Sequence, residues 1–374
     1  MKFILSSLKL LKAVQSLSGV INSNNTLPIL DDFLFNISEN ELRITASDLE
    51  TTMVVSIQPD LVEGAGEVTI PARLLIDILK NFPDIPVSFN IDETTLAIEI
   101  TTGEGRYKMA GHKSDEFPQV PVLQDASQWE IPADVLACGF EKTIFATGND
   151  EIRPVMTGVF MEMTNEGLNF VATDAHKLVR SVSECHDVDF NSSFILPKKP
   201  ANLLKGVLLK EEEPIRVTFD AKNVIFDLKN HKLVCRLIEG NYPNYNAVIP
   251  TANPNKVLVD RVELVNGIKR VAVCSNPTTN LIRMDIADNK VNLTAQDIDF
   301  SVSANETISC SYDGQPVTIG FKSTFLVEIL SNIDTPTVVV ELADSTRAGV
   351  FKPVYDDQPS SESLMLLMPM MINA

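Results

Sequence analysis

The chain has 374 residues, 44% hydrophobic and 22% charged, which is the composition of a globular protein with too many residues for one ordinary core. Its formal net charge of −19 ordinarily argues for solubility and against binding to nucleic acid. No run of roughly 18 apolar residues, the length of a membrane-spanning helix, occurs in it, so we expect no association with a membrane.

The start of the chain is apolar, but Lys9 and Lys12 interrupt the run and no small-residue cleavage site follows. We therefore expect no secretory signal and a cytoplasmic protein. The five cysteines are scattered without a CxxC pair, and no histidine stands at metal-ligand spacing. This pattern predicts reduced core cysteines, no metal site and no other cofactor.

One pattern occurs three times, as LRITASD at 42–48, LNFVATD at 168–174 and VNLTAQD at 291–297. The aspartates that end the three copies are about 125 residues apart, which is the size of a whole domain. We therefore predict three domains, at 1–125, 126–251 and 252–374.

In chain order, each copy begins with a strand and an amphipathic helix and continues with two alternating strands around the repeated pattern. A short strand, a second helix and further alternating strands complete it. The six helices are predicted at 8–20, 72–82, 133–147, 198–210, 261–275 and 322–333. The predicted fold class is α+β, with three tandem repeats of two helices on one face of an antiparallel sheet.

The charges are unevenly distributed over these elements. The chain has 50 acidic and 31 basic residues, yet basic residues outnumber acidic ones on the predicted helices. Lys12 and Arg270 lie opposite the apolar stripes of their helices at 100° per residue. A charged helix face is usually only a solvated face. Six helices with the same bias, if they share one surface, would instead attract phosphates while the acidic strands and loops repel nucleic acid elsewhere.

Several short segments resemble one known family, the bacterial DNA sliding clamp, which is the β subunit of the DNA polymerase III holoenzyme. The matching segments lie in order along the whole chain, at 26–30 (TLPIL), 47–50 (SDLE), 71–73 (PAR), 116–118 (EFP), 172–178 (ATDAHKL), 239–245 (EGNYPNY) and 368–370 (MPM). The resemblance implies a DNA clamp fold and a head-to-tail homodimer, a six-domain ring with helices lining the hole. It also implies that the ring joins the first domain near 106–109 to helix 261–275 and the adjacent strand.

The implied function is that of a processivity factor, which encircles duplex DNA, slides without sequence specificity and tethers the replicative DNA polymerase. Contacts limited to phosphates suit sliding, because they carry no sequence information. The candidate DNA-binding residues that match family positions are Arg73, Asn149, Arg153, Lys198 and Lys199, and the helical wheels add Lys12 and Arg270. Asn24 stands where the family has an arginine, so the contribution of its loop is expected to differ.

The resemblance also implies a partner-peptide pocket between the second and third domains. DNA polymerase subunits, the clamp loader and repair proteins would insert short hydrophobic motifs there. Methionine suits a surface that accepts several partners. The candidate pocket residues are Met156, Thr173, Ala175, His176, Lys177, Leu178, Pro243, Val248, Met368, Pro369 and Met370. The family often has glycine where Ala175 stands and a basic residue where Met371 stands.

Two alternatives remain open from the sequence. An enzyme is disfavoured, because the phosphate-loop, nucleophile-elbow and zinc-protease motifs do not occur and the three repeated aspartates lack clustered carboxylates. We therefore predict that the chain has no catalytic residues. The other alternative is a protein-only scaffold that binds peptides without DNA.

Overall fold

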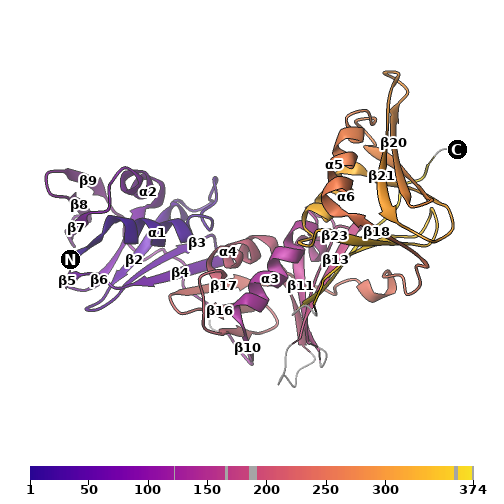
Figure 1. Cartoon of the computed structure of the whole chain (residues 1–374). Helices are drawn as coiled ribbons and strands as arrows, with labels where there is room; N and C mark the ends of the chain where they lie inside the picture. Colours follow the sequence, from indigo (N-terminus) through magenta and orange to yellow (C-terminus); the bar gives the residue numbers. More distant parts are fainter. Residues whose placement is uncertain (122, 165–166, 185–191, 358–360, 373–374) are drawn as a thin grey trace. The chain divides into compact units, whose positions relative to one another are not determined.

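The computed structural model describes residues 1–121, 123–164, 167–184, 192–357 and 361–372. The chain divides into two compact units. The first comprises Met1–Ala137 and Lys199–Leu237, and the second comprises Cys138–Lys198 and Ile238–Ala374 (Figure 1). The boundary between the units therefore falls inside the middle repeat.

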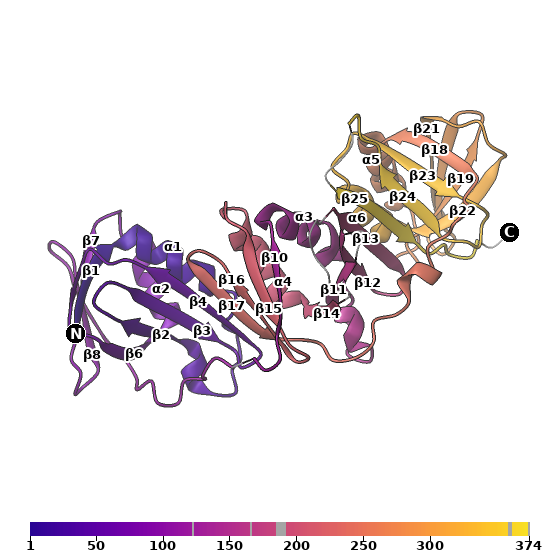
Figure 2. The ribbon, with the colours of Figure 1, turned by 90° about the horizontal axis from the view of Figure 1, so that it is seen from below.

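The first unit contains an eight-stranded antiparallel sheet, in the order β10-β15-β16-β17-β4-β3-β2-β6, and a five-stranded sheet, β5-β1-β7-β8-β9 (Figure 2). Its helices α1 (Ser7–Leu17) and α2 (Ala72–Lys80) pack against each other, and α1 covers β3 and β4. The strands are β1 (Lys2–Ser6), β2 (Asp32–Ile37), β3 (Leu42–Ser47), β4 (Thr51–Ile57), β5 (Leu61–Glu63), β6 (Gly66–Pro71), β7 (Pro86–Ile91), β8 (Ala97–Thr101), β9 (Arg106–Ala110), β10 (Ser127–Ile131), β15 (Ile215–Phe219), β16 (Asn223–Asp227) and β17 (His231–Arg236).

The second unit contains a twelve-stranded sheet in the order β14-β11-β12-β13-β25-β24-β23-β18-β21-β20-β19-β22. Helices α5 (Arg261–Ala272) and α6 (Ser323–Ser331) pack side by side in it. The strands are β11 (Gly158–Thr164), β12 (Gly167–Thr173), β13 (Lys177–Ser183), β14 (Ser192–Pro197), β18 (Asn255–Asp260), β19 (Leu281–Ala287), β20 (Lys290–Asp297), β21 (Val302–Ser311), β22 (Val317–Lys322), β23 (Thr337–Leu342), β24 (Gly349–Pro353) and β25 (Ser361–Leu367). The chain crosses between the units at three places, in helix α3 (Ala133–Thr143), in helix α4 (Lys198–Leu208) and between Leu237 and Ile238.

The α+β fold class and all six predicted helices are confirmed, with ends that differ by a few residues. The predicted helix 133–147 ends at Thr143 and tightens into a 3₁₀ turn over Ile144–Ala146. Helices α2 and α6 end early because Asn81 and Asn332 cap them, each amide donating to a carbonyl four residues back. At the start of α1 and α5, the side chains of Ser6 and Asp260 accept from backbone N–H groups.

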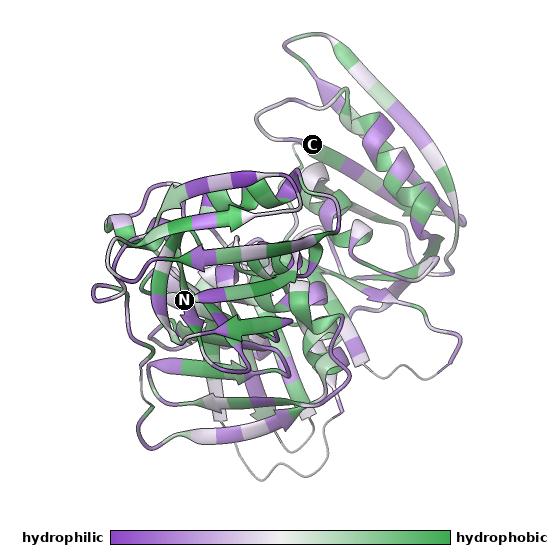
Figure 3. Cartoon of the chain, turned by 90° about the vertical axis from the view of Figure 1, so that its left-hand side faces the viewer, coloured by the Kyte–Doolittle hydropathy of each residue, from purple (hydrophilic) through white to green (hydrophobic). Residues whose placement is uncertain are grey.

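Apolar and polar residues alternate along many of the strands (Figure 3). The apolar side chains fill the cores. The apolar stripe of α1, with Leu10, Val14 and Leu17, is fully buried, as its spacing predicts. Four cysteines are free thiols, of which Cys235 is buried and Cys138, Cys274 and Cys310 are half-buried. The fifth, Cys185, lies outside the described residues.

The repeated aspartate shapes a tight turn between two strands in every copy. The Asp48 carboxylate accepts from the N–H groups of Glu50 and Thr51, and Asp174 accepts from those of His176 and Lys177. The Asp297 carboxylate accepts from the N–H of Asp299. Aspartate favours such turns because its short side chain bonds to the backbone just ahead of it. The triplicated motif is therefore a structural signal for a hairpin.

The repeats are joined within each unit by a single rule. The strand that follows the repeated aspartate pairs, antiparallel, with the last strand of the next repeat. In the first unit β4 pairs with β17, and in the second unit β13 pairs with β25. Each sheet therefore runs continuously across a joint between repeats.

Candidate nucleic-acid interface and partner-peptide site

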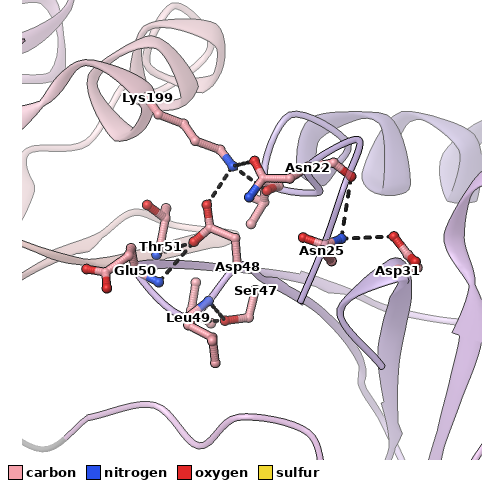
Figure 4. Close-up of polar contacts among 11 residues, drawn as sticks. Asn22, Asn25, Asp31, Ser47, Asp48, Leu49, Glu50, Thr51 and Lys199 are labelled. Carbon is pink, nitrogen blue, oxygen red and sulfur yellow. Dashed lines mark hydrogen bonds and ion pairs between the residues drawn. The ribbon is translucent and has the colours of Figure 1, made fainter. Parts of the chain in front are cut away.

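The loop after α1 gathers two of the predicted DNA-binding residues of the first unit. Arg73 donates to the carbonyl oxygens of Asn22 and Ser23, both at 3.3 Å. The Lys199 ammonium donates to the carbonyl of Val20 and to the side chain of Asn22 (Figure 4). These two cations therefore hold the loop that carries the exposed Asn24.

Lys199 is also tied to the repeated turn of the first copy. Its Nζ lies 2.6 Å from Oδ2 of Asp48, whose side chain is only 7% exposed (Figure 4). Three acceptors surround an ammonium that has three N–H groups, so its hydrogen-bonding capacity is filled. Lys199 thus has a structural role that the sequence did not reveal, and its charge is largely balanced.

Lys12 is exposed on α1 and lines a groove of about 1240 Å³ in the first unit. The groove is bounded by α1, α4, β4 and the start of β17. Its lining includes four lysines and two glutamates, namely Lys9, Lys12, Lys210, Lys229, Glu41 and Glu211. Burial and the nearby Lys210 lower the pKa of His231 at the same groove, so this imidazole is neutral at pH 7. The groove is basic although the whole chain is acidic.

Three predicted DNA-binding residues cluster in the second unit. The Lys198 ammonium lies 3.4 Å from Oδ1 of the exposed Asn149. Arg153 is exposed and pairs with Asp150 at 3.0 Å. Arg270, in contrast, makes a two-pronged ion pair with Glu306 on β21. Asn149, Arg153 and Lys198 are therefore brought together, whereas Arg270 is engaged elsewhere.

The predicted peptide-pocket residues meet around the second repeated turn and the end of the chain. Thr173, Ala175, His176, Lys177 and Leu178 form the β12–β13 turn and the start of β13. The N–H of Met368 donates to the His176 carbonyl, and the N–H of Met370 donates to the Gly320 carbonyl. Gly148 links Met156 to this turn. The Gly148 N–H donates to the Met156 carbonyl, and Gly148 itself lies close to Asp174. The tail from Met368 therefore lies between β13 and β22.

Pro243 and Val248 lie in the segment that leads into the third repeat, and Val248 is 53% exposed. Tyr242 and Tyr245 of this segment pack with Phe160 of β11, the Tyr242 ring stacked on that of Phe160 at 4.7 Å. Tyr245 also belongs to a buried cluster with Leu178 and Leu366. Burial and a hydrogen bond to Glu162 raise the pKa of Tyr245 to about 12. This buried cluster, which adjoins the segment of Val248 in the chain, therefore contains residues of both the second and the third repeat.

The candidate pocket residues differ in their exposure. Ala175, His176, Val248 and Met368 are exposed, whereas Thr173 and Leu178 are buried. The backbone of Ala175 has φ 74°, a left-handed conformation that glycine adopts without strain. This explains in physical terms why a glycine suits that position.

Lys177 is buried rather than available to a ligand, since its side chain is 5% exposed. Its Nζ lies 2.8 Å from Asp174 and 2.9 Å from Glu328 of α6, and over the ring of Phe325. Burial by itself would lower the pKa of Lys177, but the two carboxylates raise it above its ordinary value. Burial would raise the pKa of Asp174, but its hydrogen bonds from Lys177 and two backbone N–H groups lower it. Phe325 and Glu328 are members of this site that the sequence did not indicate, and only contact with the turn could reveal them.

Replacing Lys177 with methionine should lower the free energy of unfolding of the second unit by about 3 kcal/mol at pH 7, because Asp174 loses its buried counter-ion. The pKa of the Asp174 carboxyl is lower in the folded protein than in the unfolded chain. Its ionised form therefore stabilises the fold when the pH is above the pKa of the unfolded chain, and this stabilisation is lost as the pH falls through the pKa of the folded protein. The deficit of the variant should therefore shrink below about pH 4. Urea unfolding at a series of pH values measures it. Lys352→Met, which breaks the more exposed pair with Glu341, is the matched control and should cost under about 1 kcal/mol. Equal losses in the two variants would contradict a buried role for Lys177.

Comparison with known proteins places this arrangement among the sliding clamps. The fold matches a DNA polymerase sliding clamp of Pseudomonas aeruginosa with a TM-score of 0.92 and 25% identity over 100% of both chains. It matches the DNA polymerase III β subunit of Thermotoga maritima with a TM-score of 0.91, again at 25% identity over 100% of both chains. The β sliding clamp of Vibrio cholerae is 27% identical over 96% of this chain and 97% of its own length.

Three family models match in succession. They describe the N-terminal, central and C-terminal domains of the DNA polymerase III β subunit and match residues 1–121, 130–244 and 246–370. The chain therefore belongs to the DNA polymerase III β subunit family, the bacterial β sliding clamps. A sliding clamp is a non-catalytic processivity factor, a ring that encircles DNA and tethers the polymerase.

Within the described residues, no three His, Cys, Asp or Glu side chains gather so as to hold a metal ion. None of the helices described is both long and apolar enough to span a membrane.

Proposed function

We propose that two copies of this chain close head to tail into a ring around duplex DNA in the cytoplasm, and that the ring carries polymerase and repair proteins through short hydrophobic peptides. The observation that carries this proposal is the shared rule of the two internal joints. Among the described strands, β21 follows the last repeated aspartate but does not pair with the last strand of another repeat. Strand β9 is the last strand of the first repeat and does not pair with a strand that follows a repeated aspartate. A second copy supplies both.

The internal joints also predict the register of the closing joint. Thr51 pairs with Cys235 at the first joint, and Lys177 pairs with Leu367 at the second. Thr51 and Lys177 each begin the strand after the repeated aspartate, as Val302 does in the third copy. Cys235 and Leu367 each lie three residues before a residue, Ile238 or Met370, whose N–H donates to the strand just before the second helix of the repeat. Met109 does so in the first copy. Val302 should therefore lie opposite Met109 of the partner subunit.

The exposed strand β9 presents Arg106 and Lys108, and β21 presents Glu306, whose charge is balanced by Arg270 of α5. Arg270 is the tenth residue of α5, and the tenth residues of α1 and α3 are Ser16 and Lys142. Both of these lie at joints, Ser16 bonded to His231 and Lys142 bonded to Ser361. We therefore assign Arg270 to the closing joint instead of the DNA surface.

Cysteines placed at Met109 and Val302 should form a disulfide between subunits, because directly opposite residues of an antiparallel pair have Cα atoms about 4.5 to 5.5 Å apart. After loading onto a nicked circular plasmid and oxidation, the closed ring should remain on the DNA in detergent. It should be released when the plasmid is cut once. Gel electrophoresis under non-reducing conditions measures both results.

The single variants Met109→Cys and Val302→Cys control for the native cysteines and should give no covalent dimer. A disulfide in the double variant without detergent-resistant retention on the circle would support the ring and contradict encirclement of DNA. Absence of the disulfide would contradict the predicted register and the ring itself.

The surface that we assign to DNA comprises Lys12 in the first unit and Asn149, Arg153 and Lys198 in the second, with Arg73 and Lys199 supporting the loop of Asn24. Lys12 and Arg153 are exposed and Lys198 is half-buried, and cations with long side chains suit phosphate contacts that permit sliding. For partner peptides we assign the surface around Ala175, His176, Val248 and Met368. A sliding clamp of Pseudomonas aeruginosa with a TM-score of 0.94 and 25% identity has been solved bound to griselimycin, which supports a ligand site on this fold.

A further inference from the structure

The turn between β20 and β21 exposes two large apolar side chains. Ile298 is 78% exposed and Phe300 is 75% exposed. This turn is two residues longer than its counterparts, since Gln296 pairs with Ser303, whereas Ser47 pairs with Thr52. Side chains of this kind gain free energy when they are removed from water, so a surface that covers them is favoured.

The two equivalent turns contact the same element of the next repeat. The turn at Asp48 binds Lys199, the second residue of α4. The turn at Asp174 places the His176 ring on Phe325, the third residue of α6, with centroids 5.7 Å apart and planes at 24°. Both turns therefore lie against the first turn of the second helix in the repeat that follows.

In the ring, the repeat that follows the third one is the first repeat of the other copy, and its second helix is α2. The second and third residues of α2 are Arg73 and Leu74. Leu74 is 49% exposed although it lies on a helix with a buried apolar face. Arg73 is exposed beside it, and the β20–β21 turn carries the exposed Asp299 between its two apolar residues.

We propose that Ile298 and Phe300 pack on Leu74 of the partner subunit, and that Asp299 approaches Arg73 of the partner subunit. We name this contact the apolar latch. It rests on the proposed ring and adds a second contact to the β21–β9 pairing. Because its main part is apolar, it is much less sensitive to salt than a contact made of exposed ion pairs. The occupant of this turn is thus a second copy of the chain.

The test measures the dissociation constant of the dimer by dilution, using mass photometry or sedimentation. Phe300→Asp should weaken the dimer by about tenfold or more, since a carboxylate replaces a buried ring. Leu74→Arg added to Phe300→Asp should restore most of the loss by pairing the two new charges across the joint. Leu49→Asp is the matched control, because it changes an apolar residue of the first turn at an internal joint, and it should leave the dissociation constant unchanged.

An unchanged dimer with Phe300→Asp overturns the latch, and so does a double variant that dimerises no better than Phe300→Asp alone. The cysteine pair at Met109 and Val302 separates the two proposals. If the pair cross-links the parent protein but Phe300→Asp has no effect, only the latch fails. If the pair never cross-links, the ring itself fails. Circular dichroism of each variant confirms that the fold is retained.

Discussion

Replacing Lys12, Arg153 and Lys198 together with glutamate should lower the affinity of the dimer for a short DNA duplex by more than about 100-fold at 0.1 M salt. Each subunit loses three phosphate contacts, and each contact contributes about 0.9 to the slope of log affinity against log salt. The magnitude of the slope should therefore fall by about 2.7 for each subunit that contacts the duplex. Fluorescence anisotropy across a salt series measures both quantities, and loading onto circular plasmid should fall in parallel.

These three residues are chosen because they are the cations that we assign to direct contact with phosphates. Arg73 and Lys199 are left intact, since they hold the loop at 20–25 and their reversal would disturb it. The control reverses Lys222, Lys256 and Lys290, which lie on strands and a turn and change the net charge equally. An equal loss of affinity in this control would show that net charge alone acts, and would contradict a local DNA surface.

Deletion of residues 368–374 should lower the affinity for a labelled peptide with two hydrophobic anchors by about 100-fold or more, while the dimer persists. The deletion removes the exposed Met368 and the backbone hydrogen bonds that fix the tail to His176 and Gly320. Aromatic and aliphatic anchors in such pockets each contribute about 2 kcal/mol or more, so losing one wall has a large effect. Calorimetry or anisotropy measures the affinity.

A milder variant distinguishes the contribution of the tail's side chains to peptide binding from that of its backbone. Met368→Ala combined with Met370→Ala should weaken peptide binding and leave strand β25 intact. Met371→Ala is the matched control, since this side chain is 93% exposed and should contribute little. Full peptide binding by the deletion variant would contradict the assignment of this surface.

The sequence predicted the repeating fold because its signals are local. Helical periodicity, strand alternation and the turn-forming aspartate each depend on residues a few positions apart. The stripe at Leu10, Val14 and Leu17 is an example, since burial follows directly from its spacing. Helix ends were less predictable because an asparagine cap such as Asn81 competes with continued helix.

The roles of individual cations were harder to predict because they depend on the neighbouring repeat. Lys177 and Lys199 are both basic residues at positions that match the family, yet Lys177 is buried with Glu328 and Lys199 is bound to Asp48. Glu328 lies far from Lys177 in the chain, so no local pattern links them. The DNA-binding and peptide assignments therefore remain predictions that the variants above test.

The unit boundary inside the middle repeat has a consequence for how the chain can be divided. A fragment that ends after the first repeat, near residue 125, would remove β17 and leave the edge of β4 unpaired. Unpaired strand edges promote association with other chains and aggregation. A unit separated in α3, in α4 and after Leu237 would keep each of its sheets complete, but this requires three chain breaks. A single repeat therefore cannot be cut from the chain without exposing a sheet edge, whereas a compact unit can.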